Sequence, residues 1–393
     1  MQRFSQSPTD TAFVQNPYAF YEHCRAAGDL IWWDDYSLPC ATSYQAVNAL
    51  LRGQRFGREI PKDKRPDIPE HLEPFYAVEA HSMLELEGAR HTRLRSLVLR
   101  AFTSRRIQTL APETEALCHQ LIDAFPADDF DLLPHFAQKL PVIVICRLLG
   151  IPEEMNGDLL RWSNAMVTMY QARRTKEDEI AAVAATEAFV GFMRSYVEER
   201  RKSPRDDLIT SLIAAEEEGT TLTTDELITT CILLLNAGHE ATVHTLGNGI
   251  KALLEHNTRS DVYSSENIER TVEEVLRFDP PLHMFTRWAY EDAELFGHSF
   301  KAGDEVGLLL ASANRDEAAF ENAASFDASR AVKPHTSFGA GVHFCVGAPL
   351  ARLELQIAIP ILFSRCPQLA MTEPARYANL YHFHGLETLM VSH

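Results

Sequence analysis

One cysteine in this sequence has the surroundings of a metal ligand. Cys345 lies in the loop "FGAGVHFCVG", between Gly341 and Gly347, with Phe338 at the start of the loop. Glycines let the backbone curl around the sulfur, and Pro349 predicts that a helix begins just after the loop. Backbone N–H groups and the positive end of a helix dipole both favour a thiolate over a thiol. The loop therefore predicts a metal-binding sulfur; the alternative is a packing cysteine, which needs no surrounding glycines.

A second unusual stretch lies inside a predicted helix that spans about 223–256. Its apolar run stops at Asn236, and Ala237, Gly238, His239 and Glu240 follow. Glycine inside a helix costs about 1 kcal/mol relative to alanine, so it needs a reason. The stretch indicates either a reactive site on the helix or a kinked core helix with one buried, hydrogen-bonded glutamate.

The elements that must position these residues are mainly helical. The periodicity is helical from about 90 to 275, with turn-rich breaks near 126–134 and 202–207. Residues 30–56 read as short strands followed by a helix. The segment 293–311 reads as a hairpin with Gly303 and Asp304 near its turn. Thr223 and Glu226 form a capping-box pair at the start of the long helix.

These patterns predict a mostly α protein with a small β-sheet region, in one domain over 1–393. The helix-rich core spans about 90–280 and 337–365, and the β-rich parts span about 30–56, 282–330 and 370–393.

Composition limits the function classes. Acidic residues exceed basic ones by 55 − 37 = 18, so we expect no nucleic-acid partner. The longest apolar run, 140–146, is far shorter than the roughly 20 residues that span a bilayer, so we expect no membrane partner. The seven cysteines include no CxxC pair, so neither a disulfide framework nor a zinc cluster is expected. We expect a cytoplasmic monomer.

The cysteine loop resembles the haem-binding loop of the cytochrome P450 family, Phe-x-x-Gly-x-His/Arg-x-Cys-x-Gly. The resemblance extends from about residue 17 to the C-terminus and implies the cytochrome P450 fold. It also implies that Cys345 is the axial thiolate of a haem b iron, with Phe338, Gly339 and Gly347 around it. A thiolate ligand pushes electron density onto the iron and favours cleavage of the O–O bond.

The resemblance assigns further residues to the cofactor. His91 and Arg95 of "HTRLR", Arg287 of "MFTRWAYED" and His343 of the loop correspond to cations that bind the haem propionates. A structural triad behind the loop is also implied: Glu274 and Arg277 of "VEEVLRFDPP", with Arg330 of "FDASR".

The long helix of the family crosses the distal face of the haem. Ala237 and Gly238 would leave space for O₂, and Glu240 would help to deliver protons. The family pattern places an alcohol directly after the acid, but this chain has Ala241 there and Thr242 one position later. Water or a substrate hydroxyl would have to fill that gap, unless the reaction needs no full cycle of oxygen activation.

The resemblance also suggests which residues form the walls of a substrate pocket. Most are apolar, as a small-molecule pocket requires. Asn236 is the exception, and we hypothesise that it hydrogen-bonds a polar group of the substrate; the alternative is a side chain bonded to its own helix backbone. The wall residues are Leu84, Leu86, Leu233, Asn236, Ala237, Leu282, Met284, Phe285, Tyr381, His382 and Phe383.

The predicted function is that of a haem-thiolate monooxygenase acting on a small, mainly apolar organic substrate. The sequence carries no flavin or iron–sulfur domain, so electrons from NAD(P)H would come through a ferredoxin, or a flavodoxin, and its reductase. A basic patch on the thiolate side would suit an acidic ferredoxin; it comprises Arg100, Arg105, Arg106 and Arg352. Two alternatives stay open: an atypical reaction such as oxidative coupling, ring formation or peroxide-driven oxidation, and a haem-binding sensor or electron carrier without a substrate.

Overall fold

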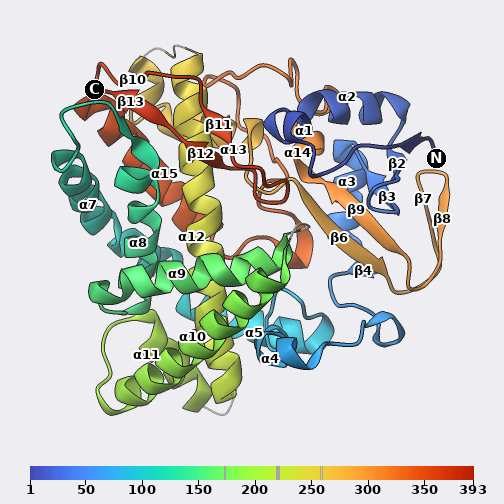
Figure 1. Cartoon of the computed structure of the whole chain (residues 1–393), viewed down its shortest axis with the longest axis horizontal. Coiled ribbons are helices and arrows are strands. Elements are labelled where there is room, and N and C mark those ends of the chain that lie inside the picture. Colours follow the sequence, from blue (N-terminus) through green and yellow to red (C-terminus); the bar gives the residue numbers. More distant parts are fainter. Residues whose placement is uncertain (172–173, 218–221, 257, 259) are drawn as a thin grey trace.

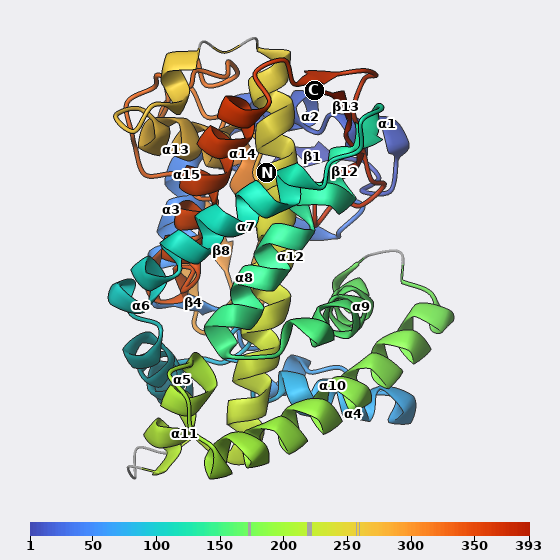
Figure 2. The same cartoon turned by 90° about the vertical axis from the view of Figure 1, so that its left-hand side faces the viewer.

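The computed structural model describes residues 1–393 except 172–173, 218–221, 257 and 259. One long helix, α12 (Thr224–Glu255), runs through the middle of the molecule in both ribbon views (Figures 1 and 2). Its 32 residues give a length of about 48 Å. Thr223 caps the helix, and the predicted capping box with Glu226 is confirmed.

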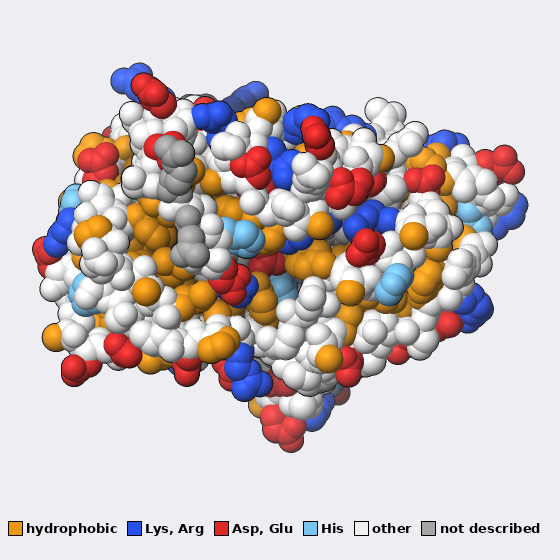
Figure 3. All heavy atoms as spheres, turned by 90° about the horizontal axis from the view of Figure 1, so that it is seen from above, with side chains coloured by type: hydrophobic (Ala, Val, Ile, Leu, Met, Phe, Trp, Pro, Cys, Tyr) orange, Lys and Arg blue, Asp and Glu red, His pale blue; other side chains and the backbone are white. Residues whose placement is uncertain are grey.

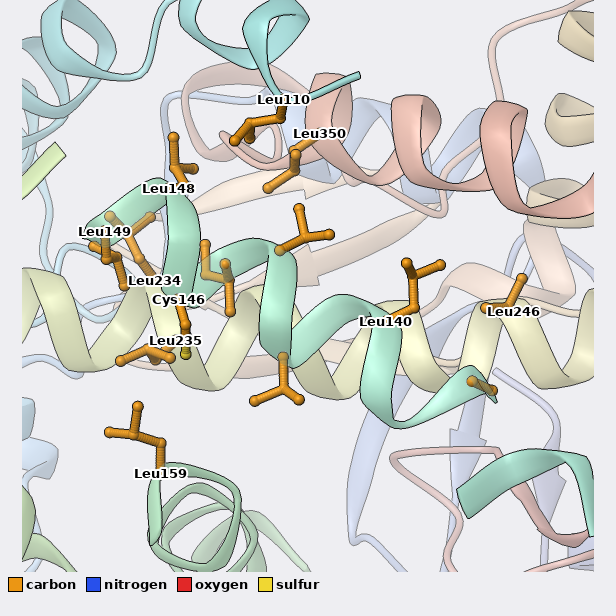
Figure 4. Close-up of a cluster of buried hydrophobic side chains, with 14 of the residues drawn as sticks. Leu110, Leu140, Cys146, Leu148, Leu149, Leu159, Leu234, Leu235, Leu246 and Leu350 are labelled. Carbon is orange, nitrogen blue, oxygen red and sulfur yellow. The ribbon is translucent and has the colours of Figure 1, made fainter. Parts of the chain in front are cut away.

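The other helices pack around α12, mostly on the side away from the large sheet (Figure 1). Helix α8 lies directly against it, and Figure 4 shows leucines of the two helices interleaved, with Cys146 of α8 turned toward α12. The helices before α12 are α1 (Thr11–Gln15), α2 (Tyr18–Ala27), α3 (Tyr44–Arg52), α4 (Glu73–Glu79), α5 (Gly88–Ala101), α6 (Ser104–Thr109), α7 (Ala111–Asp123), α8 (Lys139–Leu149), α9 (Asn156–Val167), α10 (Lys176–Lys202) and α11 (Leu208–Glu217). Those after it are α13 (Ile268–Phe278), α14 (Leu310–Ala313) and α15 (Ala348–Arg365).

The largest sheet in the described chain joins the N-terminal part to the segment after α13. Its order is β1-β2-β3-β9-β6-β4, with β9 parallel to β3 and antiparallel to β6. The strands are β1 (Arg3–Phe4), β2 (Leu30–Trp33), β3 (Leu38–Ala41), β4 (Phe56–Gly57), β6 (Met284–Ala289) and β9 (Glu305–Leu309). The short strands and the helix predicted within residues 30–56 are therefore confirmed as β2, β3 and α3.

Smaller sheets complete the β-structure. β10 (Ala370–Met371), β13 (Met390–Ser392) and β5 (Phe130–Asp131) form one, β11 (Arg376–Tyr377) and β12 (Leu386–Thr388) another, and β7 (Ala293–Leu295) pairs with β8 (His298–Phe300).

The predicted position of the hairpin turn is wrong. The turn between β7 and β8 consists of Phe296 and Gly297, both with positive φ, as a two-residue hairpin loop requires. Gly303 and Asp304 lie in the next turn, which leads into β9.

Helix α10 is long and apolar enough, by length and composition, to cross a membrane. Its buried residues recur every three or four positions, and this face packs against α9 and α12. A helix in the core of a globular protein can have the same length and composition, so these two properties alone do not indicate a membrane span.

The structure brings the three residues of the predicted triad together. Arg277 donates to both oxygens of Glu274, at 2.7 and 2.8 Å, and Arg330 Nε donates to Glu274 Oε2 at 2.9 Å. The remaining N–H groups of Arg277 bind the backbone oxygens of Asn314, Ala323 and Ser325. The cluster thus ties α13 to the segment that precedes the cysteine loop.

We expect Glu274→Gln to lower the free energy of unfolding by about 3 kcal/mol, because it leaves the buried guanidinium of Arg277 and the half-buried one of Arg330 without a carboxylate. The matched control is Glu153→Gln, which breaks the exposed pair with Arg147 and should cost less than about 1 kcal/mol. Urea unfolding measures both. Equal stability of the two variants would contradict the role of the cluster.

Candidate active site

The loop before α15 is shaped by its glycines. Gly339 and Gly341 have φ of 66° and 71°, in the left-handed region that glycine tolerates. A Cβ on Gly341 would lie 2.6 Å from the Leu51 carbonyl oxygen, so no side chain fits there. The N–H of Cys345 donates to the Phe338 carbonyl oxygen at 2.9 Å, which closes the loop directly before the helix.

The Cys345 sulfur lies between opposing influences. Burial raises the pKa of its thiol, whereas the N–H groups of Gly347 and Ala348 and the cations Arg95 and Arg352 lower it without outweighing the burial. The N–H groups at the start of the helix therefore act in the predicted direction, and the burial of the sulfur opposes them with the larger effect. Coordination to a metal ion deprotonates a thiol outright, so an iron held by Cys345 would stabilise the thiolate against this burial.

The other cysteines lie in the core. All six are buried, while Cys345 is half-buried. Burial raises the pKa of Cys118, Cys146 and Cys231 to about 12, so they remain thiols.

Arginine and histidine side chains lie around the loop, at the positions that the resemblance implies. Arg95 of α5 donates to the Phe344 carbonyl oxygen, and the rings of His91 and His343 lie 4.2 Å apart. Burial, followed by His343, lowers the pKa of His91 to about 4, so this imidazole is neutral. Arg287 is buried in β6, and burial followed by Arg58 lowers its pKa to about 10.

These donors fit a haem. Among the described residues, the guanidinium of Arg287 donates only to the backbone oxygen of Thr286, at 2.9 Å. His91 Nε2 is buried, and the described part of the chain gives it no hydrogen-bond partner. A buried guanidinium and an unpaired imidazole nitrogen suit the two propionates, and Cys345 Sγ suits the iron.

Two residues of this region had no signal in the sequence. Glu87 accepts hydrogen bonds from His343 Nε2 and the Arg58 N–H, both at 2.7 Å. Arg58 itself lies over the ring of Phe285, 5.0 Å from its centroid. Both belong to segments far from the loop in sequence, so only the fold could reveal them.

One stripe of α12 is accessible where the rest of the helix is buried. Ala237 is exposed in the middle of the helix. Because the spacing is helical, the partly exposed residues lie on one face with it. They are Leu233, Asn236, Glu240, Ala241 and His244.

Gly238 and Thr242 lie off this stripe. Gly238 is half-buried, and a Cβ there would meet the side chain of Ile145 at 3.3 Å, so the glycine permits close packing of α12 on α8. Thr242 is buried, and its hydroxyl donates to the Gly238 carbonyl oxygen at 3.0 Å. The place of Gly238 beside the O₂ space stays a prediction. Because its hydroxyl is bonded within the helix, Thr242 does not replace the alcohol missing at Ala241.

Glu240 is flanked by two histidines. Its oxygens lie 3.4 Å from His244 Nε2 and 3.8 Å from His239 Nδ1. Burial raises the pKa of Glu240, but His244, with a smaller effect of His239, outweighs this and leaves the pKa below its ordinary value. The spacing of four residues between Glu240 and His244 was a signal for this pair that the sequence analysis missed.

The predicted wall residues fall into two groups. Leu84, Leu233, Leu282, Phe285 and Phe383 are half-buried, and Leu282 and Phe383 form a β-bridge. Leu86 belongs to the main core.

The other wall residues face elsewhere. Met284 and Tyr381 pack in a separate core with Phe13, Tyr21 and Trp33, and His382 contacts the Tyr36 hydroxyl. We therefore remove these three from the pocket. Met284 lies on the face of β6 that packs against the N-terminal aromatic residues, and Tyr381 and His382 lie in the turn before β12 and contact the same N-terminal segment.

The sequence model described as "Cytochrome P450" matches residues 42–266 and 257–373 of this chain. The chain belongs to the cytochrome P450 family. It is 38% identical to the polyketide biosynthesis cytochrome P450 PksS of Bacillus subtilis, covering 100% of this chain and 99% of that protein. Identity to the cytochrome P450 monooxygenase PikC of Streptomyces venezuelae is 34%, with 91% and 86% covered.

Among solved structures, P450BioI in complex with a hexadec-9Z-enoic acid-ligated acyl carrier protein superposes with a TM-score of 0.91 at 32% identity. It covers 98% of this chain and 100% of that one. The predicted P450 fold is thus confirmed, and this P450 is an oxidoreductase of the monooxygenase class whose family uses haem and O₂.

We expect Cys345→Ala to abolish the thiolate-type spectrum of the reduced carbon monoxide complex, because no other sulfur can replace this ligand. Cys366→Ala, the matched control, removes a buried packing cysteine and should keep the spectrum. A normal spectrum from Cys345→Ala protein would refute the assignment of the ligand.

Proposed function

We propose that this P450 inserts one oxygen atom from O₂ into a small, mainly apolar organic substrate, with electrons from NAD(P)H delivered by a separate ferredoxin and reductase. The observation that carries the proposal is the accessible stripe on α12, where Leu233 and Ala237 offer an apolar surface beside the acid Glu240. A binding site for a small molecule combines such a surface with few polar groups.

The chain's own residues have distinct tasks in this reaction. The haem, once bound through Cys345, supplies oxygen activation and transfer. The guanidinium carbon of Arg352 lies 4.7 Å from the centroid of the Phe338 ring, and this contact fixes one side of the loop. Glu240 is an ionised carboxylate at rest, so it would first accept a proton and then pass it toward the pocket. Arg95, Arg287, His91 and His343 anchor the cofactor.

Asn236 is the polar group that would orient the substrate. Its Nδ2 lies 3.8 Å from Met166 Sδ, and its Oδ1 has no hydrogen-bond partner in the described part of the chain. The alternative, a side chain bonded to its own helix, is therefore not observed. Oδ1 is a free acceptor for a substrate hydroxyl or N–H.

The docking surface for a redox partner would be the exposed side of the cysteine loop. Val342 and Phe344 are exposed there, and Arg100 and Arg105 are exposed on the neighbouring helices. Arg352 contributes little, because Glu273 pairs with two of its three nitrogens, Nε and Nη2, and offsets its charge. A small apolar area edged by arginines suits an acidic ferredoxin.

A second candidate is an atypical reaction, such as oxidative coupling or ring formation. Ala241 favours it, because the alcohol that the family pattern places there is missing and Thr242 faces away. Such a reaction would form a new bond within the substrate instead of adding oxygen to it.

A compound screen for the spin-state shift of the iron, followed by product analysis, tests the proposal. The screen includes long acyl chains, free and on a carrier protein, since the P450BioI relative was solved with such a conjugate. We expect a shift, and a product heavier by one oxygen with the ferredoxin system. Products without added oxygen would support the atypical reaction, and no shift with any compound would contradict both candidates.

We expect Asn236→Val to weaken binding of a polar-substituted substrate about ten-fold, because a buried substrate donor loses its acceptor. Spectral titration measures the affinity, and an analogue without the polar group is the control, which should bind both proteins equally. Unchanged affinity and regiochemistry with the polar substrate would remove Asn236 from the site.

A further inference from the structure

A buried cluster of two histidines and one carboxylate lies outside the haem site. It consists of Asp279, His283 and His384, whose exposed fractions are 6%, 0% and 1%. One candidate ligand atom from each residue lies within 4.8 Å of the other two. Two imidazoles and a carboxylate are a common ligand set for zinc and other divalent transition metals. The set contains no cysteine, so the cysteine spacing in the sequence could not indicate it.

The separations in this cluster are close to those of a coordination shell. Zinc bonds to nitrogen and oxygen are about 2.0–2.2 Å long, so two ligand atoms of a tetrahedral zinc ion lie about 3.4 Å apart. His384 Nε2 and Asp279 Oδ1 have nearly this separation, at 3.6 Å. The rings of His283 and His384 lie 4.5 Å apart. Small side-chain rotations are therefore enough to bring all three ligands onto one ion.

Both histidines have a nitrogen available for a metal. His283 Nδ1 contacts the Tyr21 hydroxyl at 2.9 Å, whereas His283 Nε2 is buried and has no hydrogen bond in the described part of the chain. A histidine that binds a metal usually hydrogen-bonds through its other nitrogen in this way. His384 Nδ1 is also buried and unbonded. Burial lowers the pKa of both rings, to about 3 for His384, so each is the neutral imidazole that metals bind.

Asp279 is held by groups of the kind that surround a metal-binding carboxylate. Its Oδ1 accepts the Tyr18 hydroxyl at 2.6 Å, and its Oδ2 accepts that of Tyr377. Each carboxylate oxygen has two lone pairs, so each keeps one for a metal. The nearby cation Arg315 donates to two backbone carbonyl oxygens and, among the described residues, forms no ion pair with Asp279.

Asn248 of α12 fixes the two segments that carry the ligands. Its Nδ2 donates to the His384 carbonyl oxygen at 2.9 Å and to that of Asp279 at 3.2 Å. The His384 N–H donates to the Pro281 carbonyl oxygen at 2.7 Å. Backbone positions that are set before binding lower the cost of ordering the ligands.

A surface hollow gives an ion access to the cluster. Its volume is about 770 Å³, and its walls include Asp279, His384, Tyr377, Lys251 and Glu255. Figure 3 looks onto the face that carries α2 and the end of α12, and shows charged and histidine side chains around a hollow near its middle. Solvent in the hollow can supply the fourth ligand that a zinc ion with three protein ligands takes.

We propose that Asp279, His283 and His384 bind a divalent metal ion of the zinc class, and that this ion clamps one wall of the substrate pocket. The second part rests on the proposed function. Leu282 and Phe383 form a β-bridge and are half-buried wall residues, and they directly precede the two histidines in the chain. A metal that links the histidines therefore ties together the two segments that carry this wall.

Zinc binding is tested on the haem-loaded protein without an affinity tag, after treatment with a chelator. Calorimetric titration with zinc chloride near neutral pH should give one strong site per haem. Anomalous diffraction at the zinc edge should place that ion within bonding distance of Asp279, His283 and His384, and this measurement needs no variant. A protein without stoichiometric zinc, or with zinc bound only elsewhere, would overturn the site.

Variants assign the ligands. His283→Gln and His384→Gln should each weaken zinc binding about 100-fold or more, because even the loss of an outer-shell partner costs about 10- to 100-fold. His256→Gln is the matched control: His256 lines the same hollow, but its Nδ1 is bonded to the Ala252 carbonyl oxygen at 2.8 Å. The reduced carbon monoxide spectrum shows whether each variant keeps its haem site. Equal zinc affinity of wild type and all three variants would contradict the assignment.

The clamp is tested by spectral titration of a substrate with and without zinc. Ordering the wall before binding should tighten substrate binding about three-fold or more in wild type and leave His384→Gln unaffected. Unchanged affinity in wild type with zinc bound would refute the clamp.

Hydrogen exchange separates a failure of the clamp from a failure of the proposed function, because it needs no substrate. Zinc should slow amide exchange in segments 281–284 and 380–386 of wild type and have no such effect in His384→Gln. Exchange that ignores zinc would contradict the clamp. If no compound shifts the spin state, the proposed function fails, while the zinc titration and the exchange rates still decide the site and the clamp.

Discussion

A helix buried on nearly all sides has to keep one polar, accessible face, and the rest of this structure is arranged around that constraint. Helix α12 satisfies it by placing leucines and small residues against α8 and the surrounding helices, with Gly238 allowing a close approach to Ile145. The opposite face carries Ala237, Glu240 and His244. A buried carboxylate needs charged or hydrogen-bonding partners. His239 and His244 lie beside Glu240 and meet this need, and the backbone at Gly385 packs against His244.

The sulfur side shows a similar balance between burial and charge. The loop that presents Cys345 is fixed by two glycines in the left-handed region and by the hydrogen bond that closes it. Burial keeps the thiol protonated in the protein alone, even with Arg95 and Arg352 nearby. The protein therefore supplies position, shielding and part of the stabilising charge, and an iron held by Cys345 would supply the rest.

The sequence predicted features that depend on neighbours in the chain. The capping box at Thr223, the start of α15 at Pro349 and the meeting of Glu274 with Arg277 depend on spacings of a few residues. Features that depend on distant segments were missed or wrong. Met284 and Tyr381 face the N-terminal aromatic core because α1 and α2 cover that side of the sheet, and Arg352 is held by Glu273 of α13. No local pattern reveals that Gly385 rests on His244.

The central claim is that the Cys345 sulfur and the accessible face of α12 lie on opposite sides of one haem. Anomalous diffraction at the iron edge from crystals of the haem-loaded protein tests it most directly, because it locates the iron independently of any assumed ligand. The account predicts a single iron bonded to Cys345 Sγ, with Ala237 and Glu240 on the other side of the porphyrin plane and the propionates beside Arg287 and His91. An iron bound by a histidine, or a porphyrin that does not lie between the loop and α12, would contradict it.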